Sequence, residues 1–203
     1  MGFMRASSLI AAIGVAFALA AASDANAQQA QRFTGEVQSV KGDDVMVKKP
    51  DGQVVDVVLA GDVAVNHAVK ASLADIKPGS FVGTGAYPDG DSFKAAEVHI
   101  FPQGSRQGEG HRPWSSDPSG TMTNAEVTAA VVSADRDQLT LTTNGRSYKI
   151  TVPPDAPIVR FEKGSKSLVR KGAWVGVSNG VEQNGKVAVK SITVSDDRRY
   201  PVR

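Results

Sequence analysis

The sequence has no cysteine and few aromatic residues, which make up 6% of its 203 positions. The absence of cysteine excludes disulfide cross-links, thiol nucleophiles and cysteine-ligated zinc. An excess of one charge is also missing, because 23 Lys and Arg residues stand against 21 Asp and Glu residues. This balance gives no electrostatic signal for a polyanionic partner. With 41% hydrophobic and 22% charged residues, the composition is that of a globular protein with one large or two small domains.

The longest apolar run lies at the beginning of the chain. Arg5 precedes 14 apolar or small residues, 9–22, and the run ends before Ala25-Asn26-Ala27, an A-x-A cleavage pattern. As a helix the run would reach roughly 21 Å, which is short of the ~30 Å hydrocarbon core and disfavours a retained membrane anchor. We therefore expect residues 1–27 to be a cleaved signal peptide. The mature protein is expected to be periplasmic, with no integral membrane segment.

From residue 32 onward, short segments rich in β-branched residues alternate with turn residues, a period-2 pattern typical of half-buried strands. A single helical turn is expected over residues 72–76, opened by the N-cap Ser72 and closed by Lys77-Pro78-Gly79. Expected strands lie near residues 33–40, 44–49, 53–59, 80–87 and 93–101, and then near 125–134, 138–143 and 146–152.

The order of these elements occurs twice. Matching landmarks are Gly52 and Gly145, and Gly79 and Gly172, both at an offset of 93, and Val98 and Ile192 at an offset of 94. We interpret this pattern as tandem duplication of a unit of roughly 70 residues. Five strands with a short helical turn between the third and the fourth are the order of the OB-fold, a small Greek-key barrel.

The sequence therefore predicts an all-β protein with two tandem five-stranded OB-like Greek-key barrels. The first barrel is expected at residues 32–101 and the second at 124–197, joined by a segment at 102–123 and followed by a basic tail at 198–203. Barrel closure would point Val45, Val47, Val55, Val57, Val82 and Ile100 inward, and Lys48, Asp56, Glu97 and His99 outward. The alternatives are two barrels that share strands by swapping, and a fused open sheet.

Two segments carry a resemblance to a known family. Residues 72–82 (SLADIKPGSFV) are similar to the signature of a family of exported bacterial OB-like repeat domains of unknown function. Residues 99–124, from His99-Ile100-Phe101-Pro102 to Met122-Thr123-Asn124, resemble the connecting motif of that family. Its members are often labelled metal transporter permeases, although a permease needs several helices of about 20 apolar residues. The resemblance implies the two-barrel fold and supplies no catalytic residues.

Residues 102–123 form a Gly- and Pro-rich segment unlike the expected barrels. A loop of this length inside a compact protein is usually functional or a linker. We expect its tryptophan to anchor it against one or both barrels, so that its polar residues lie beside the groove between them and bind a small ligand or an envelope protein. The alternative is an exposed flexible connector. The candidate binding residues are Arg106, Glu109, His111, Arg112 and Trp114.

Two of the three histidines, His99 and His111, flank this segment, so metal binding is an alternative. His99, Glu109 and His111, with Asp117 as a further candidate, offer imidazole and carboxylate ligands suited to zinc, copper or nickel. Their spacing matches neither H-x-x-x-H nor H-E-x-x-H, so no helix would set the ligand geometry. A periplasmic metal-handling accessory protein that binds a divalent metal is the alternative function.

Signatures of catalysis and of nucleic-acid binding are weak. The glycine pairs Gly83/Gly85 and Gly108/Gly110 lack the strand-to-helix context of a phosphate loop. The second and third strands of each unit, which bind oligonucleotides in many OB-folds, carry one aromatic residue, Tyr148. We therefore expect a protein that is not an enzyme and binds no nucleic acid, with a purely structural envelope role as a third function.

Overall fold

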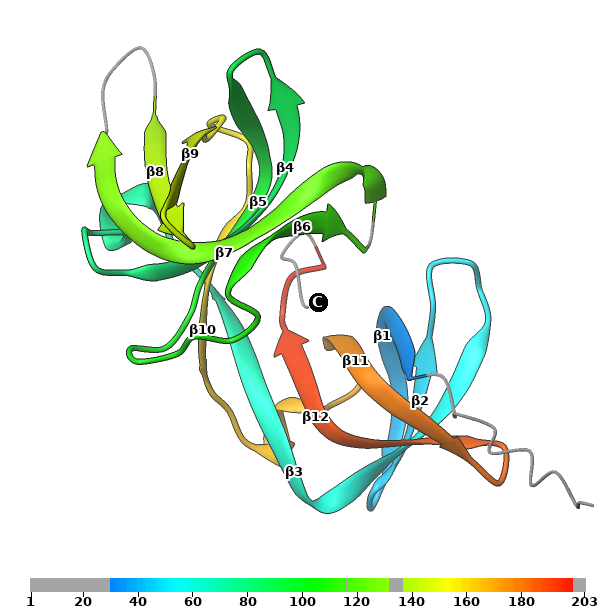
Figure 1. Cartoon of the computed structure of the whole chain (residues 1–203). Helices are drawn as coiled ribbons and strands as arrows, with labels where there is room; N and C mark the ends of the chain where they lie inside the picture. The colour runs from blue at the N-terminus through cyan, green and yellow to red at the C-terminus, as the bar shows by residue number, and fades with distance from the viewer. Residues whose placement is uncertain (1–29, 116, 132–136, 199–203) are drawn as a thin grey trace, which may run out of the picture.

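Strands dominate the computed structural model, which describes residues 30–115, 117–131 and 137–198 (Figure 1). Residues 1–27, expected to be a signal peptide, lie outside these ranges, as do residues 199–203 of the expected basic tail. In the ranges described, no helix is both long and apolar enough to cross a lipid bilayer. The prediction of an all-β protein is confirmed.

Twelve strands of the described chain join into one sheet, and two short 3-10 turns lie between them. Valine, isoleucine and threonine are frequent in these strands, because their branched side chains pack well on a pleated surface. The strands are β1 (Gln31–Lys41), β2 (Asp44–Lys48), β3 (Val54–Lys70), β4 (Phe81–Asp89), β5 (Ser92–Ile100), β6 (Gly110–Trp114), β7 (Asp117–Val131), β8 (Gln138–Thr143), β9 (Arg146–Thr151), β10 (Ile158–Lys163), β11 (Trp174–Gln183) and β12 (Lys186–Ser195), and the turns are η1 (Leu73–Asp75) and η2 (Lys166–Leu168).

The sheet closes into two five-stranded barrels (Figure 1). Barrel A is the ring β1, β2, β3, β12 and β11, in which β11 returns to pair with β1. Barrel B is the ring β7, β8, β9, β5 and β4, in which β4 returns to pair with β7. The pairs β3–β12 and β9–β5 are parallel, and the other pairs of the rings are antiparallel. Closure gives each strand of a ring two hydrogen-bonded neighbours.

The barrel boundaries predicted from the sequence are wrong. Residues 32–101 do not close one barrel and 124–197 another, because each barrel takes three strands from one half of the chain and two from the other. Strand sharing, the predicted alternative, describes the pairing. The physical reason lies in β3, which was expected to end at residue 59. It continues to Lys70, with Val65 buried and Val63 half-buried, and so delivers the following strands to the other barrel.

Two crossing strands connect the barrels and lie side by side (Figure 1). The end of β3 pairs with β10 in antiparallel fashion, with Lys70 opposite Val159 and Ala68 opposite Phe161. Ala68 and Phe161 are 93 residues apart, the same offset as the glycine landmarks. Ala68, Val159 and Phe161 also form a small core of their own. The two-stranded ribbon formed by the end of β3 and β10 is therefore symmetric about the pair Ala68–Phe161.

The pairings of the two barrels correspond at the same offsets. In barrel A Val57 faces Val187, and in barrel B the equivalent residues, Ile150 and Phe93, face each other. Nearer the ribbon, Val65 faces Ile192, and Ile158 faces Val98. The strands that each half contributes to the other half's barrel therefore pair in the same way in both barrels.

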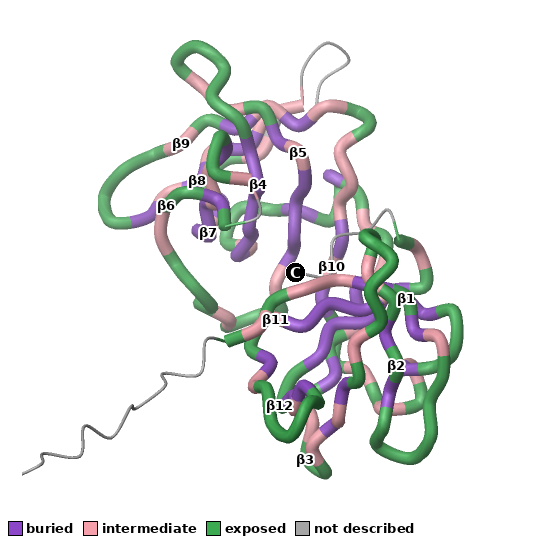
Figure 2. The backbone as a smooth tube through the Cα atoms, turned by 90° about the vertical axis from the view of Figure 1, so that its right-hand side faces the viewer, coloured by how far each residue is buried: buried purple, intermediate pink, exposed green. Residues whose placement is uncertain are grey.

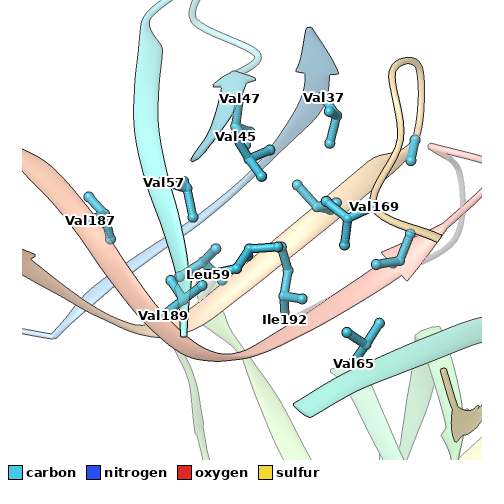
Figure 3. Close-up of a cluster of buried hydrophobic side chains, with 14 residues drawn as sticks. Val37, Val45, Val47, Val57, Leu59, Val65, Val169, Val187, Val189 and Ile192 are labelled. Atoms are coloured by element: carbon cyan, nitrogen blue, oxygen red, sulfur yellow. The ribbon is translucent and has the colours of Figure 1, made fainter. Parts of the chain in front are cut away.

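Each barrel encloses its own apolar core, and buried stretches alternate with exposed ones along the strands of both lobes (Figure 2). Barrel A is filled mostly by valines from all five strands (Figure 3). Side chains of this kind each contribute about 1.5–3 kcal/mol when they leave water. The residues predicted to point inward are buried, except Val55, which is half-buried against the same core.

Two of the four residues predicted to point outward lie on an outer face but are buried there. Lys48 and Asp56 are exposed, whereas Glu97 and His99 are each 4% exposed. Alternation with Val98 places both on the outer face of β5, away from the core of barrel B. That face is covered, because β10 pairs with β5 and the ring centroid of Phe161 lies 5.2 Å from that of His99.

The connecting segment 102–123 is not a structureless linker. It contains β6, and β7 begins within it, at Asp117. β6 lies antiparallel along β7, with Gly110 opposite Asn124. The strand β6 was not predicted, because glycine and proline are unusual in strands. Pro113 is tolerated here because β6 is an edge strand with one neighbour, β7.

Candidate binding site between the barrels

A cavity of ≈340 Å³ lies where barrel A, barrel B and the connecting segment meet. Larger hollows of ≈540, ≈500 and ≈410 Å³ exist, but the first is lined by barrel A alone and the other two by barrel B with its adjoining loops. The smaller cavity is lined by both barrels. Its polar and aromatic lining includes Arg32, Ser178 and Asn179 from barrel A, Arg112 and Trp114 from β6, and His99 and Asn124 from barrel B.

Trp114 anchors the connecting segment on barrel B. Its side chain is 5% exposed and lies over two glycines, Gly85 in β4 and Gly120 in β7. A Cβ atom at Gly85 would come within 2.5 Å of the indole, so the ring fits only over a residue without a side chain. Tyr87 meets the indole edge-on, with ring centroids 6.0 Å apart. The anchoring predicted for Trp114 is therefore present, and it fixes one wall of the cavity.

Two arginines approach the cavity from different elements. Nη1 of Arg32, on β1, donates a hydrogen bond to Oγ of Ser115 over 3.1 Å. Nη1 of Arg112, on β6, donates to the carbonyl oxygen of Gly108 over 2.7 Å. Among the ion pairs of the described residues, neither guanidinium meets a carboxylate. Both positive charges are thus held by neutral partners.

Two buried polar side chains line the cavity from barrel B. Nε2 of His99 lies 3.3 Å from Oε1 of Glu97, a contact that lacks the geometry of a hydrogen bond. Asn124 is 6% exposed and donates from Nδ2 to the carbonyl oxygen of Gln107 over 2.9 Å. Its Oδ1 has no hydrogen-bond partner within the described protein. A buried polar atom left in this state costs about 1–3 kcal/mol.

Three of the predicted binding residues lie outside the cavity. Arg106 pairs with Glu126 at 2.9 Å and with Glu109 at 3.7 Å, and it lies over the ring of Phe81. His111 stacks on Tyr148 and places Nδ1 2.8 Å from Oγ1 of Thr123. Burial lowers the pKa of the His111 imidazole. Arg112 and Trp114 are therefore the predicted residues that the structure brings to the site.

The predicted metal set is not assembled. Among the residues that the structure describes, no three His, Asp or Glu side chains are grouped so that they could hold a metal ion. His99 contacts Glu97, Glu109 contacts Arg106, and His111 contacts Tyr148. The further candidate, Asp117, accepts hydrogen bonds from Ser119 and from Tyr87, which lower the pKa of its carboxyl.

Sequence reasoning missed the contribution of barrel A to this cavity. Ser178 and Asn179 lie in Gly176-Val177-Ser178-Asn179-Gly180, which matches the G-x-S-x-G pattern of hydrolase nucleophiles. Here the pattern lies inside β11, which continues to Gln183 without the strand-to-helix turn that exposes such a serine. Glycines inside a strand often mark a close approach of another segment, and this was the available signal.

Comparisons of the chain with protein-family models, with curated proteins and with solved structures found no match. The resemblance to exported OB-like repeat domains stays a prediction.

Proposed function

We propose that this protein is a non-catalytic binding protein of the cell envelope, which holds a small ligand in the cavity between its barrels. The observation that carries the proposal is the meeting of both barrels and the connecting segment around ≈340 Å³ of space. Small-molecule sites typically measure roughly 300–1,000 Å³ and occur preferentially between domains. Export of the mature chain to the periplasm follows from the expected signal peptide, residues 1–27.

The fold that supports this function is a pair of OB-like barrels in a strand-exchanged form. In each half of the chain three antiparallel strands precede a short helical turn and a two-stranded hairpin, and each barrel closes through a parallel pair of strands from the two halves. This is the strand order of the OB-fold. The equal offsets of the paired residues support an origin by tandem duplication.

Binding can be tested by nuclear magnetic resonance on the ¹⁵N-labelled mature chain. A library of small molecules that includes neutral, cationic and anionic compounds is added, and shifts of the backbone amide signals are mapped. Binders are expected to shift the signals of Gly108, Ser115 and Asn179, which line the cavity.

The matched variants are Asn179→Trp, which fills the cavity from an exposed position, and Gln183→Trp, which places the same side chain at the end of the same strand. The first should abolish the shifts and the second should preserve them. Shifts that survive in Asn179→Trp, or a library without any binder at the cavity, would contradict the proposed function.

A further inference from the structure

The charge around the cavity between the barrels has one sign. Arg32 and Arg112 line it, and no Asp or Glu is among the residues that do. The two arginines come from barrel A and from the connecting segment, so their guanidinium groups approach the space from separate elements. A cavity with this lining attracts anions and disfavours cations.

These two arginines differ from others of the described chain in their partners. Arg106, Arg160 and Arg170 each contact at least one carboxylate, at 2.6–3.7 Å. Arg32 and Arg112 instead donate to a serine hydroxyl and to a backbone carbonyl. A carboxylate that entered the cavity would replace these neutral acceptors by a charged one, and charge-assisted hydrogen bonds are roughly twice as strong as neutral ones. Planar guanidinium groups also match the planar geometry of a carboxylate.

The rest of the lining requires more than a bare anion. Phe101, Pro113, Trp114 and Met122 give the cavity apolar walls. An inorganic ion would leave these walls in contact with water, whereas an apolar body would cover them.

The positions of the two arginines set the direction of such a ligand. His99 lines the cavity from barrel B, whereas Arg32 comes from barrel A and Arg112 from β6. An anionic group is favoured at the arginines. The ligand would therefore place its charge near Arg32 and Arg112 and its body against Trp114.

We infer that the cavity selects small organic carboxylates with an aromatic or alicyclic body. This inference rests on the proposed function, since it names the ligand class of the same site. It requires that the negative charge and the apolar body both contribute to binding.

Three probes separate these contributions: 2-naphthoate, its neutral isostere 2-naphthamide, and inorganic phosphate. Each is titrated into the mature chain by isothermal calorimetry, with amide shifts used to place the binding. We expect 2-naphthoate to bind about tenfold tighter than 2-naphthamide or more, since tenfold corresponds to about 1.4 kcal/mol, the scale of one charge-assisted hydrogen bond. Phosphate should bind more weakly than 2-naphthoate.

The variants are Arg32→Gln and Arg112→Gln, with Arg146→Gln as the matched control. Arg146 is an exposed arginine of β9 that does not line the cavity, so its replacement changes the net charge equally. Each cavity variant should weaken 2-naphthoate by about tenfold and leave 2-naphthamide unchanged. Arg146→Gln should leave both affinities unchanged.

The outcomes distinguish this inference from the proposed function. Equal binding of 2-naphthoate and 2-naphthamide, or unchanged 2-naphthoate binding in both cavity variants, would overturn anion selection while the cavity remained a binding site. Phosphate that binds as tightly as 2-naphthoate would show that the apolar body does not contribute to binding. Cavity binders in the wider library that are all neutral or cationic would overturn the inference alone, and the absence of any binder would remove both.

Discussion

Barrels A and B share one plan but are filled differently at one end. Phe33 of β1 and Thr123 of β7 hold equivalent positions, because they face Val177 and Thr84, which are themselves 93 residues apart. Barrel A therefore has a large ring where barrel B has a small hydroxyl. The difference shows how two halves with the same pairing have acquired different interiors.

In barrel B the connecting segment supplies the missing ring. Its His111 stacks on Tyr148 with centroids 4.3 Å apart, meets Phe93 edge-on, and contacts Oγ1 of Thr123. This histidine is accounted for by packing and one hydrogen bond. The metal-ligand interpretation of the sequence failed here because a histidine between two turns gave no sign of an aromatic partner on β9.

In barrel A the corresponding end has no such insertion. The residues equivalent to Tyr148 and Phe93 are the aliphatic Val55 and Val187, and together with Phe33 they line part of the ≈540 Å³ hollow. The segment between β5 and β7 therefore has two roles on two faces of barrel B. Its histidine closes the end of the barrel, and its tryptophan and Arg112 form the cavity between the barrels.

The largest effect should come from separating the two halves. A cut after Gly104 leaves β1–β5 in one fragment and β6–β12 in the other, so each barrel loses two or three strands. We expect neither fragment alone to give a folded monomer, and an equimolar mixture to restore the circular dichroism of the intact chain as a one-to-one complex measured by light scattering. A folded monomer from the first fragment would mean that its strands close a barrel without the other half.

A smaller loss of stability is expected from a substitution beneath Trp114, which covers barrel B but has no counterpart on barrel A among the described residues. Gly85 in β4 and Ser178 in β11 are equivalent positions, 93 residues apart. Gly85→Ser should lower the free energy of unfolding in urea by about 1–3 kcal/mol, because the new Cβ would overlap the indole of Trp114. The double variant with Trp114→Ala should lose this penalty. Undiminished stability of Gly85→Ser would show that the indole does not need a glycine beneath it.

His111, which closes one end of barrel B, should make the stability of the protein sensitive to pH. Burial lowers the pKa of His111 below the ordinary histidine value of 6.5, so the unfolded chain binds a proton more readily than the folded one. Its contribution to stability is therefore complete above pH 6.5 and is lost as the pH falls through the lowered pKa. His111→Phe keeps the ring but cannot titrate, and it should show a smaller difference in urea midpoint between pH 7.5 and pH 5.5. An equal difference in both proteins would assign the pH dependence to other groups.

The smallest effects should come from two equivalent surface contacts. Arg106 lies over Phe81 in barrel B, and Arg198 lies over the equivalent Trp174 in barrel A, at 5.4 and 5.7 Å. Replacement of either by Gln should cost less than about 1 kcal/mol, the scale of exposed cation–π pairs. Of the two variants, Arg106→Gln should lower the free energy of unfolding more than Arg198→Gln, because Arg106 also pairs with Glu126. A larger loss in Arg198→Gln would reverse this ranking, and urea unfolding of both variants provides the measurement.

Local features of the fold could be predicted because local chemistry determines them. Gly52 and the pair Asn144-Gly145 adopt positive φ in the hairpin turns expected at these positions. The inward valines follow from period-2 alternation. The exchange of strands could not be predicted, because each half has the same pattern whether its last two strands return to their own barrel or cross to the other.

The candidate site could likewise be predicted only where a local signal in the sequence marks its residues. Trp114 and Arg112 stood out because large and charged residues are unusual in a segment rich in glycine and proline. Arg32 and Asn179 are brought to the cavity by contacts between the halves, which have no local signature in the sequence. The burial of His99 was missed for the same reason, since β10 covers it from the other half.

The exchange of strands also dictates when each barrel can form as the chain is made. Barrel B can assemble as soon as β9 has been synthesised, because β4, β5, β7 and β8 precede it. Barrel A has to wait for β11 and β12, so the first three strands made pair with one another early but wait longest for the two strands that close their ring. Until then their valine-rich faces stay open to mispairing, which is the hazard that long-range strand contacts bring to a nascent chain.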